Sequence, residues 1–250
     1  MRVMTYLDTE TVAERIQRAI NADEPFSLIR LGDGEARLLG YPEYCSWRDL
    51  STSLAYWYGP FAPGKDDVMQ LKMDLIAACR NADVLGLPSE AQVGKNKFYK
   101  LLYHLVGVHG LARGDTCHCG VHRWLLSEGY LFDILKGLPF VTLITCRDVS
   151  RMFLDELDVG VVRRIDVPVE AQTGTPKRRH YPDRHVEIVK ELGEWASGIV
   201  LVGAGPNGKV YCDAAKDAGA IALDLGSLFD IWARVPSRSY IKQELDKETE

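Results

Sequence analysis

Short apolar runs alternate with amphipathic segments along most of the chain. Strand-sized runs are predicted at residues 26–31, 84–87, 139–146, 160–167, 198–202 and 220–223. Helices are predicted at residues 9–22, 66–81, 96–109, 121–136, 149–157, 184–196 and 210–218. Because this order is typical of parallel strands joined by crossover helices, the pattern predicts an α/β fold in which helices cover both faces of a mostly parallel sheet.

Size and charge narrow the class of protein further. With 250 residues, 46% of them hydrophobic and 26% charged, the chain can bury a full core. We therefore expect a single domain over residues 1–250, with a charged tail that frays over about 242–250. The formal net charge is −5, whereas nucleic-acid-binding domains are usually net positive, so no nucleic-acid partner is expected.

Membrane and secretion signals are not predicted. Every apolar run falls far short of the roughly 20 residues that a transmembrane helix needs. Asp8 and Glu10 come before any apolar run, so no signal peptide is expected. The six cysteines of a chain this long are expected to stay thiols in a reducing compartment, which predicts a cytoplasmic protein.

Cys117, Cys119 and His122 have the spacing of metal ligands. A structural zinc site usually takes its four ligands from two separated pairs, and no second pair accompanies this one. The expected alternative is a strand end followed by a helix start, and metal binding by these residues stays open.

Residues 41–64 contain many aromatic residues and three prolines, without a clean period. This composition predicts a functional loop region. Within it, Tyr56, Trp57 and Tyr58 could stack on a sugar, although such a triplet also occurs in cores.

Polar residues follow several of the predicted strands. Because the carboxyl ends of parallel strands meet at one edge of an open α/β sheet, these residues are expected to share one cleft. They are Asp33, Glu35, residues 88–90, Arg147, Asp148, residues 168–180 and residues 203–209.

The strongest local motif runs from Arg30 to Glu35. Asp33 and Glu35, separated by one glycine on a tight turn, are oxygen ligands of the kind that Mg²⁺ or Mn²⁺ prefers. The alternative is structural: Asp33 caps a helix that begins at Ala36, and Glu35 favours the dipole of that helix.

A second motif places glycines at Gly203, Gly205 and Gly208, followed by Lys209. Such a turn brings backbone N–H groups to a phosphate at a helix N-terminus. Asp224 follows it at about the sequence spacing at which an acidic residue contacts the ribose of a bound dinucleotide. A dinucleotide-binding motif normally lies near the start of its domain, whereas here only one βαβ unit follows the glycine-rich turn. The alternative is that these glycines serve only the turn and close packing.

A basic loop after a predicted strand contains Lys177, Arg178, Arg179 and His180. In an acidic protein such a cluster is suited to attract an anionic substrate or to cover a diphosphate. The alternative is a solvated loop.

The order of these motifs resembles the GT-D family of glycosyltransferases. The resemblance is carried by residues 26–35, with the DxE pair Asp33 and Glu35, by residues 202–209 and by residues 223–227. It implies a Rossmann-like αβα sandwich that moves a sugar, typically from a UDP-sugar, to a hydroxyl of a glycan or glycoprotein acceptor with Mn²⁺ or Mg²⁺. The metal ligands that it implies are Asp33 and Glu35. The residues expected to bind the donor are Arg30, Gly32, Arg178, Arg179, Gly203, Gly205, Gly208, Lys209 and Asp224.

An inverting hexosyltransferase also needs a group that takes the proton of the acceptor hydroxyl. Four side chains on suitable loops are candidates, and the sequence does not choose among them: Glu90, Asp148, Glu170 and His180. The rival predictions are an enzyme that binds NAD(P) or S-adenosylmethionine at the Gly203–Gly208 turn, and a non-catalytic module that binds a nucleotide sugar. A homodimer stays open.

Overall fold

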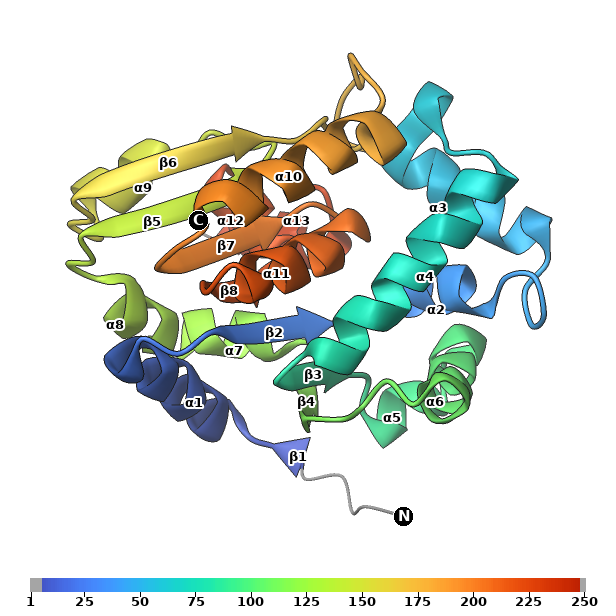
Figure 1. The fold of residues 1–250 in the computed structure, drawn as a ribbon, viewed down its shortest axis with the longest axis horizontal. Helices are drawn as coiled ribbons and strands as arrows, with labels where there is room; N and C mark the ends of the chain where they lie inside the picture. The colour runs from blue at the N-terminus through green and yellow to red at the C-terminus, as the bar shows by residue number, and fades with distance from the viewer. Residues whose placement is uncertain (1–5, 248–250) are drawn as a thin grey trace.

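The computed structural model describes residues 6–247, and its eight strands form one parallel sheet (Figure 1). The strand order is β1-β4-β3-β2-β8-β7-β5-β6, and every neighbouring pair is parallel. The strands are β1 Tyr6–Leu7, β2 Phe26–Arg30, β3 Val84–Leu87, β4 Asp115–His118, β5 Phe140–Thr145, β6 Val161–Asp166, β7 Ile199–Gly203 and β8 Ile221–Asp224. The predicted α/β class with a parallel sheet is confirmed.

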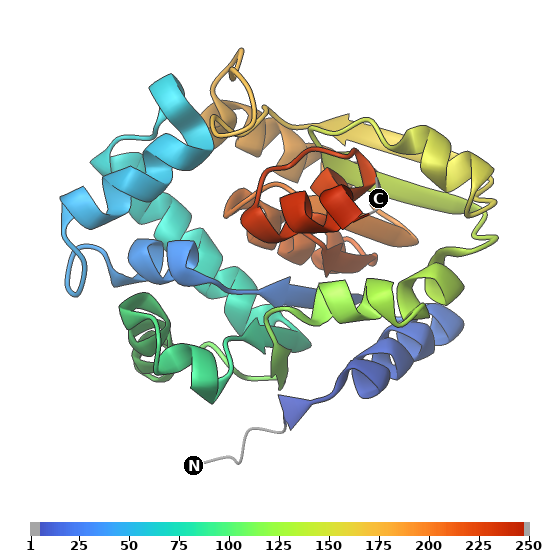
Figure 2. The same cartoon turned by 180° about the vertical axis from the view of Figure 1, so that it is seen from behind.

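Helices cover both faces of this sheet and complete a Rossmann-like αβα sandwich. In Figure 1 α10 and α11 lie in front of the sheet, whereas α7 lies in front of it in Figure 2. The helices are α1 Thr9–Ala22, α2 Asp33–Gly40, α3 Trp47–Tyr58, α4 Lys65–Asn81, α5 Glu90–Val93, α6 Lys97–His109, α7 Val121–Ser127, α8 Tyr130–Leu135, α9 Ser150–Asp155, α10 His185–Trp195, α11 Asn207–Asp217, α12 Leu228–Trp232 and α13 Ser239–Lys247, with short helical turns at Gly59–Phe61 and His180–Arg184.

The alternation of side chains along the strands explains the two layers. In β7, Val200 and Val202 belong to the core under α4, α10 and α11, whereas Ile199 and Leu201 belong to the core under α1, α7 and α8. Successive strand residues point to opposite faces, so a strand that is apolar throughout supplies both cores. This is why the buried strands read as continuous apolar runs in the sequence.

Several elements differ from the sequence prediction. Residues 47–58, expected as part of a loop region, form helix α3, which begins with a capping box of Ser46 and Asp49. Gly129, with φ of 86°, divides the single helix expected over residues 121–136 into α7 and α8. The short strand β1 was not predicted, and of β4 only the strand end near Cys117 was expected.

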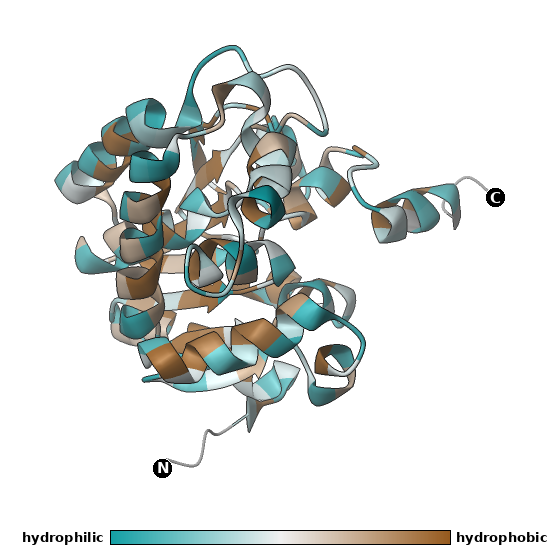
Figure 3. Cartoon of the chain, turned by 90° about the vertical axis from the view of Figure 1, so that its right-hand side faces the viewer, coloured by the Kyte–Doolittle hydropathy of each residue, from teal (hydrophilic) through white to brown (hydrophobic). Residues whose placement is uncertain are grey.

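Where a frayed tail was expected, α13 continues the chain to Lys247; residues 248–250 of that tail lie outside the described residues. Figure 3 views the molecule toward the carboxyl ends of the strands, with α13 extending to one side. No helix within residues 6–247 combines the length and the apolar character that crossing a bilayer requires.

Candidate functional site

A cleft of about 620 Å³ opens at the carboxyl ends of the strands. Its walls come from β2, β5 and β7 and from the loops that follow these strands, as the positions of the polar residues along the sequence predict. The charged side chains that line it are Arg30, Asp33, Glu35, Arg37, Arg123, Arg147, Glu170, Lys209, Asp230 and Arg238. Cations outnumber carboxylates in this cleft although the whole chain is acidic, so the cleft suits an anionic ligand.

The turn after β2 directs two carboxylates toward this cleft. Helix α2 begins at Asp33, not at Ala36 as predicted, and Gly32 is its N-cap. Glu35 Oε2 accepts a hydrogen bond from the Gly32 backbone N–H at 2.9 Å. The Asp33 side chain is 44% exposed and lies 3.3 Å from Arg37, so it does not cap the helix and keeps a carboxylate that ligands can reach. A side chain on Gly34 would overlap the Trp57 indole, which explains the glycine between them.

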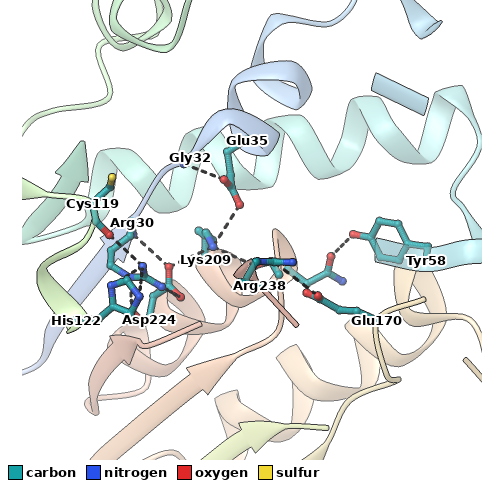
Figure 4. Close-up of polar contacts among 12 residues, drawn as sticks. Arg30, Gly32, Glu35, Tyr58, Cys119, His122, Glu170, Lys209, Asp224 and Arg238 are labelled. Carbon is teal, nitrogen blue, oxygen red and sulfur yellow. Dashed lines mark hydrogen bonds and ion pairs between the residues drawn. The ribbon is translucent and has the colours of Figure 1, made fainter. Parts of the chain in front are cut away.

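Behind these carboxylates lies a buried chain of alternating charges (Figure 4). Lys209 Nζ lies 3.3 Å from Glu35 Oε1 and 3.2 Å from Asp224 Oδ2, and it donates to the Gly205 carbonyl oxygen at 3.1 Å. Burial alone would lower the pKa of Lys209, but the Asp224 and Glu35 carboxylates outweigh it and raise the pKa. Lys209 is therefore held as a cation between the two motifs.

Arg30 continues this chain on the other side of Asp224. Its Nε donates to the Asp224 carbonyl oxygen at 2.6 Å, and its Nη1 donates to the Cys119 carbonyl oxygen at 3.0 Å. Burial opposes the charge of Asp224, but Arg30 and Lys209 together lower the pKa of its carboxyl. Asp224 is 1% exposed and does not line the cleft. In this structure it holds the Arg30 and Lys209 cations in place.

The Cys117–His122 segment is a strand end followed by a helix start, as the non-metal alternative predicts. Arg30 Nη1 lies 2.8 Å from His122 Nδ1. Burial, and then the Arg30 charge, hold the pKa of His122 well below its ordinary value, so the neutral ring can accept this hydrogen bond. Among residues 6–247, no group of three or more His, Cys, Asp and Glu side chains is placed to hold a metal ion.

The glycine-rich turn joins β7 to α11, and its glycines have different environments. Gly205 has a φ of +56° and lines the cleft, so it meets the backbone requirement of the turn. A Cβ on Gly203 would overlap the Phe229 ring, and one on Gly208 would lie 3.1 Å from Val202. Gly208 does not line the cleft, and packing accounts for both of these positions.

Another part of the cleft wall is built from segments that are distant in the sequence. Glu170, on the loop after β6, accepts a hydrogen bond from Gln172 and lies 3.9 Å from Arg238 Nη2. Arg238 also contacts Tyr56 of α3, and the three predicted aromatic residues 56–58 do line the cleft. Sequence reasoning missed Arg238 because it lies in no motif and comes just before the tail that was expected to fray.

The basic loop contributes less to the cleft than its composition predicts. Lys177, Arg178 and Arg179 are exposed and do not line the cleft, and Arg178 pairs with Glu187 at 3.1 Å. His180 does line it, but its Nε2 lies 2.8 Å from the Tyr211 hydroxyl.

Two further candidates lie outside the cleft lining. Glu90 is exposed on the short helix α5. Asp148 is exposed and pairs with Arg164 at 3.0 Å.

Comparisons with known proteins agree with this architecture. No curated protein matches the sequence. A structure titled as a new glycosyltransferase (DUF1792) from Streptococcus sanguinis superimposes with a TM-score of 0.59 at 17% identity, covering 90% of this chain and 82% of that one. A second, titled as the domain of unknown function 1792 with a distinct glycosyltransferase fold, gives a TM-score of 0.57 at 16% identity and covers 89% of this chain and 78% of that one. A family model described as a GT-D fold-like domain matches residues 7–232, so the chain belongs to the family of GT-D fold-like domains.

Proposed function

We propose that this protein is a metal-dependent glycosyltransferase. It moves a sugar, of the hexosyl class, from a nucleotide-sugar donor, a UDP-sugar, to a hydroxyl of a glycan or glycoprotein acceptor. The observation that carries the proposal is the shared cleft: the Asp33 and Glu35 carboxylates open into the same space as Gly205, in the turn just before α11. Membership in the GT-D fold family supports the same reaction class.

The DxE pair fits a divalent cation. Asp33 has an exposed carboxylate that lies 3.3 Å from the Arg37 guanidinium. Glu35 binds the Gly32 N–H and Lys209, and because each carboxylate oxygen has two acceptor sites, it can still ligate. We therefore propose Asp33 and Glu35 as the residues that would hold Mn²⁺ or Mg²⁺. When bound, such an ion stabilises the negative charge that develops on a diphosphate leaving group.

Protein groups near this pair are suited to bind the diphosphate itself. The N-terminus of the 11-residue helix α11 carries a partial positive charge at the cleft. Lys209, in its first turn, adds a full charge, and Arg123 lines the cleft with its guanidinium over the Tyr240 ring at 4.8 Å. The N–H groups of the first turn of α11 and the Arg123 guanidinium can donate charge-assisted hydrogen bonds to phosphate oxygens. The three N–H groups of Lys209 already face Glu35, Asp224 and the Gly205 carbonyl, so Lys209 contributes its charge and no further hydrogen bond.

The proposed compartment is the cytoplasm. All six cysteines are free thiols, which agrees with a reducing environment. The proposed stereochemistry is inverting, a single displacement at the anomeric carbon in which the acceptor hydroxyl loses a proton.

Calorimetry with UDP, GDP, NAD and S-adenosylmethionine, each with and without Mn²⁺, tests this function. We expect one nucleoside diphosphate to bind in a Mn²⁺-dependent manner, and we expect Asp33→Ala to abolish that dependence. The matched control is Asp66→Ala, an exposed aspartate on α4 that does not line this cleft. Metal-independent binding of NAD or S-adenosylmethionine would instead favour a cofactor site at the Gly203–Gly208 turn. Tight donor binding without turnover or donor hydrolysis would indicate a non-catalytic module.

A further inference from the structure

The fold reduces the four candidate proton acceptors to two. Glu90 and Asp148 are exposed outside the cleft, whereas Glu170 and His180 line it. Because a general base must reach the proton that it takes, directly or through one water, only the two cleft residues have the required access.

The His180 ring is buried and already has partners within the protein. Its Nε2 lies 2.8 Å from the Tyr211 hydroxyl, and its ring makes an edge contact with Tyr58. Burial lowers the pKa of His180 to about 3, so the ring is a very weak proton acceptor at neutral pH. A base with so low a pKa contributes little driving force to proton transfer.

Glu170 has one oxygen that is held and one that is free. Oε2 accepts from Gln172 and faces Arg238 at 3.9 Å. Within the described part of the chain Oε1 has no hydrogen-bond partner, and it would lie 3.1 Å from a Cβ on Gly205. Oε1 therefore lies in the cleft next to Gly205 and is available to accept a proton.

We infer that Glu170 is the general base of the transfer. The inference rests on the proposed function and adds to it the residue that activates the acceptor. The acceptor O–H bond breaks as its proton moves to Glu170 Oε1, and the oxygen electron pair forms the new bond to the anomeric carbon. The bond between the anomeric carbon and the phosphate oxygen breaks, and its electron pair leaves with the nucleoside diphosphate. Glu170 then releases the proton to solvent.

The electrostatic surroundings suit this role. Burial raises the pKa of Glu170 to about 7, against a lowering by the Gln172 hydrogen bond. A base works best when its pKa lies near the working pH, so a carboxyl near 7 is a far better base than an ordinary glutamate. The other charged or titratable groups that face it are Asp230, which raises this pKa, Lys209 and Arg147, which lower it, and Arg238, Cys146 and Tyr58.

The test measures release of UDP from UDP-sugars in the presence of Mn²⁺, with water or simple alcohols as acceptors. Glu170→Gln keeps the size of the side chain and an oxygen that can accept the hydrogen bond from Gln172. We expect this variant to lower the rate by about 10²–10⁴-fold. The Kd for UDP with Mn²⁺, measured by calorimetry, is expected to stay within about twofold of wild type, because Glu170 does not bind the donor. Glu194→Gln, an exposed glutamate on α10, is the matched control and should keep the wild-type rate.

A pH profile separates proton transfer from structural damage. The wild-type rate should rise about tenfold per pH unit below a midpoint near pH 7 and level off above it. The residual rate of Glu170→Gln should lack this rise. Gln172→Leu, which removes a hydrogen bond that lowers the pKa of Glu170, should move the midpoint to higher pH.

The outcomes distinguish this inference from the proposed function. Wild-type rates and an unchanged pH profile in Glu170→Gln would overturn the assignment of Glu170 alone. A wild-type protein that binds no nucleoside diphosphate, or that binds one and releases none from any donor, would overturn the proposed transfer and the base together.

Discussion

Lys209 Nζ lies 3.3 Å from Glu35 Oε1, which ties the first helical turn after the glycine-rich motif to the DxE turn 174 residues earlier in the chain. Asp224, 3.2 Å away, binds the same ammonium group. One cation thus fixes the relative positions of the two motifs that are proposed to hold the metal and the donor.

The first prediction concerns this cation. Lys209→Met should lower the free energy of unfolding by about 3–5 kcal/mol, because it leaves Glu35 and Asp224 buried without their shared partner. Urea denaturation measures the loss, and Lys190→Met, an exposed lysine on α10, is the control. If Lys209→Met were as stable as the control variant, the buried ion pairs would not hold the two motifs together.

The second prediction separates binding from stability at Asp33. Asp33→Asn should strongly reduce the increase in UDP affinity that Mn²⁺ produces, because a neutral amide is a weaker ligand for a divalent cation than a carboxylate. Its side chain is 44% exposed, so the unfolding free energy should change by no more than about 0.5 kcal/mol. Calorimetry and urea denaturation on the same preparation check both parts. A Mn²⁺ effect as large as in wild type would remove Asp33 from the proposed ligands.

Much of the fold could be predicted from the sequence because its central strands are buried on both faces. Strands such as Val84–Leu87 consist of apolar residues throughout, so a continuous apolar run marks each of them. Helix α3 was missed for the opposite reason. Its buried residues Leu50, Ser53, Leu54 and Tyr58 lie among aromatic residues that are exposed or only partly buried, and these hide the helical period.

The motifs of the site could be found from the sequence, but their partners could not. The DxE turn and the glycine-rich turn are local patterns. The contact between Arg238 and Tyr56 joins residues 182 positions apart, and it depends on how α13 and its preceding loop pack. Arg238 also lies beyond residues 7–232, so the family match does not include this part of the cleft wall.

The third prediction tests why Gly203 is a glycine. Gly203→Ala should cost about 1–3 kcal/mol of unfolding free energy, since the added methyl would overlap the Phe229 ring. Combining it with Phe229→Leu should cost less than the sum of the two single variants, because the smaller side chain makes room. The control is Gly107→Ala in helix α6, where a Cβ would meet nothing within 4 Å, and a gain of about 0.5–1 kcal/mol is expected. Strictly additive effects at Gly203 and Phe229 would mean that their packing is not the constraint.

The fourth prediction follows from the raised pKa of Glu170, about 7 in the fold against 4.5 as its ordinary value. Below pH 4.5 the carboxyl is protonated in both states, so its ionisation makes no difference between them. As the pH rises from 4.5 to 7, the unfolded chain has lost this proton while the fold keeps it, so folding stability falls; above 7 the loss is constant. Glu170→Gln cannot ionise and should therefore gain stability relative to wild type across that range, by up to about 3 kcal/mol. Urea denaturation of both proteins from pH 4.5 to 8.5 measures the difference, and parallel stability curves would mean that Glu170 titrates at its ordinary value.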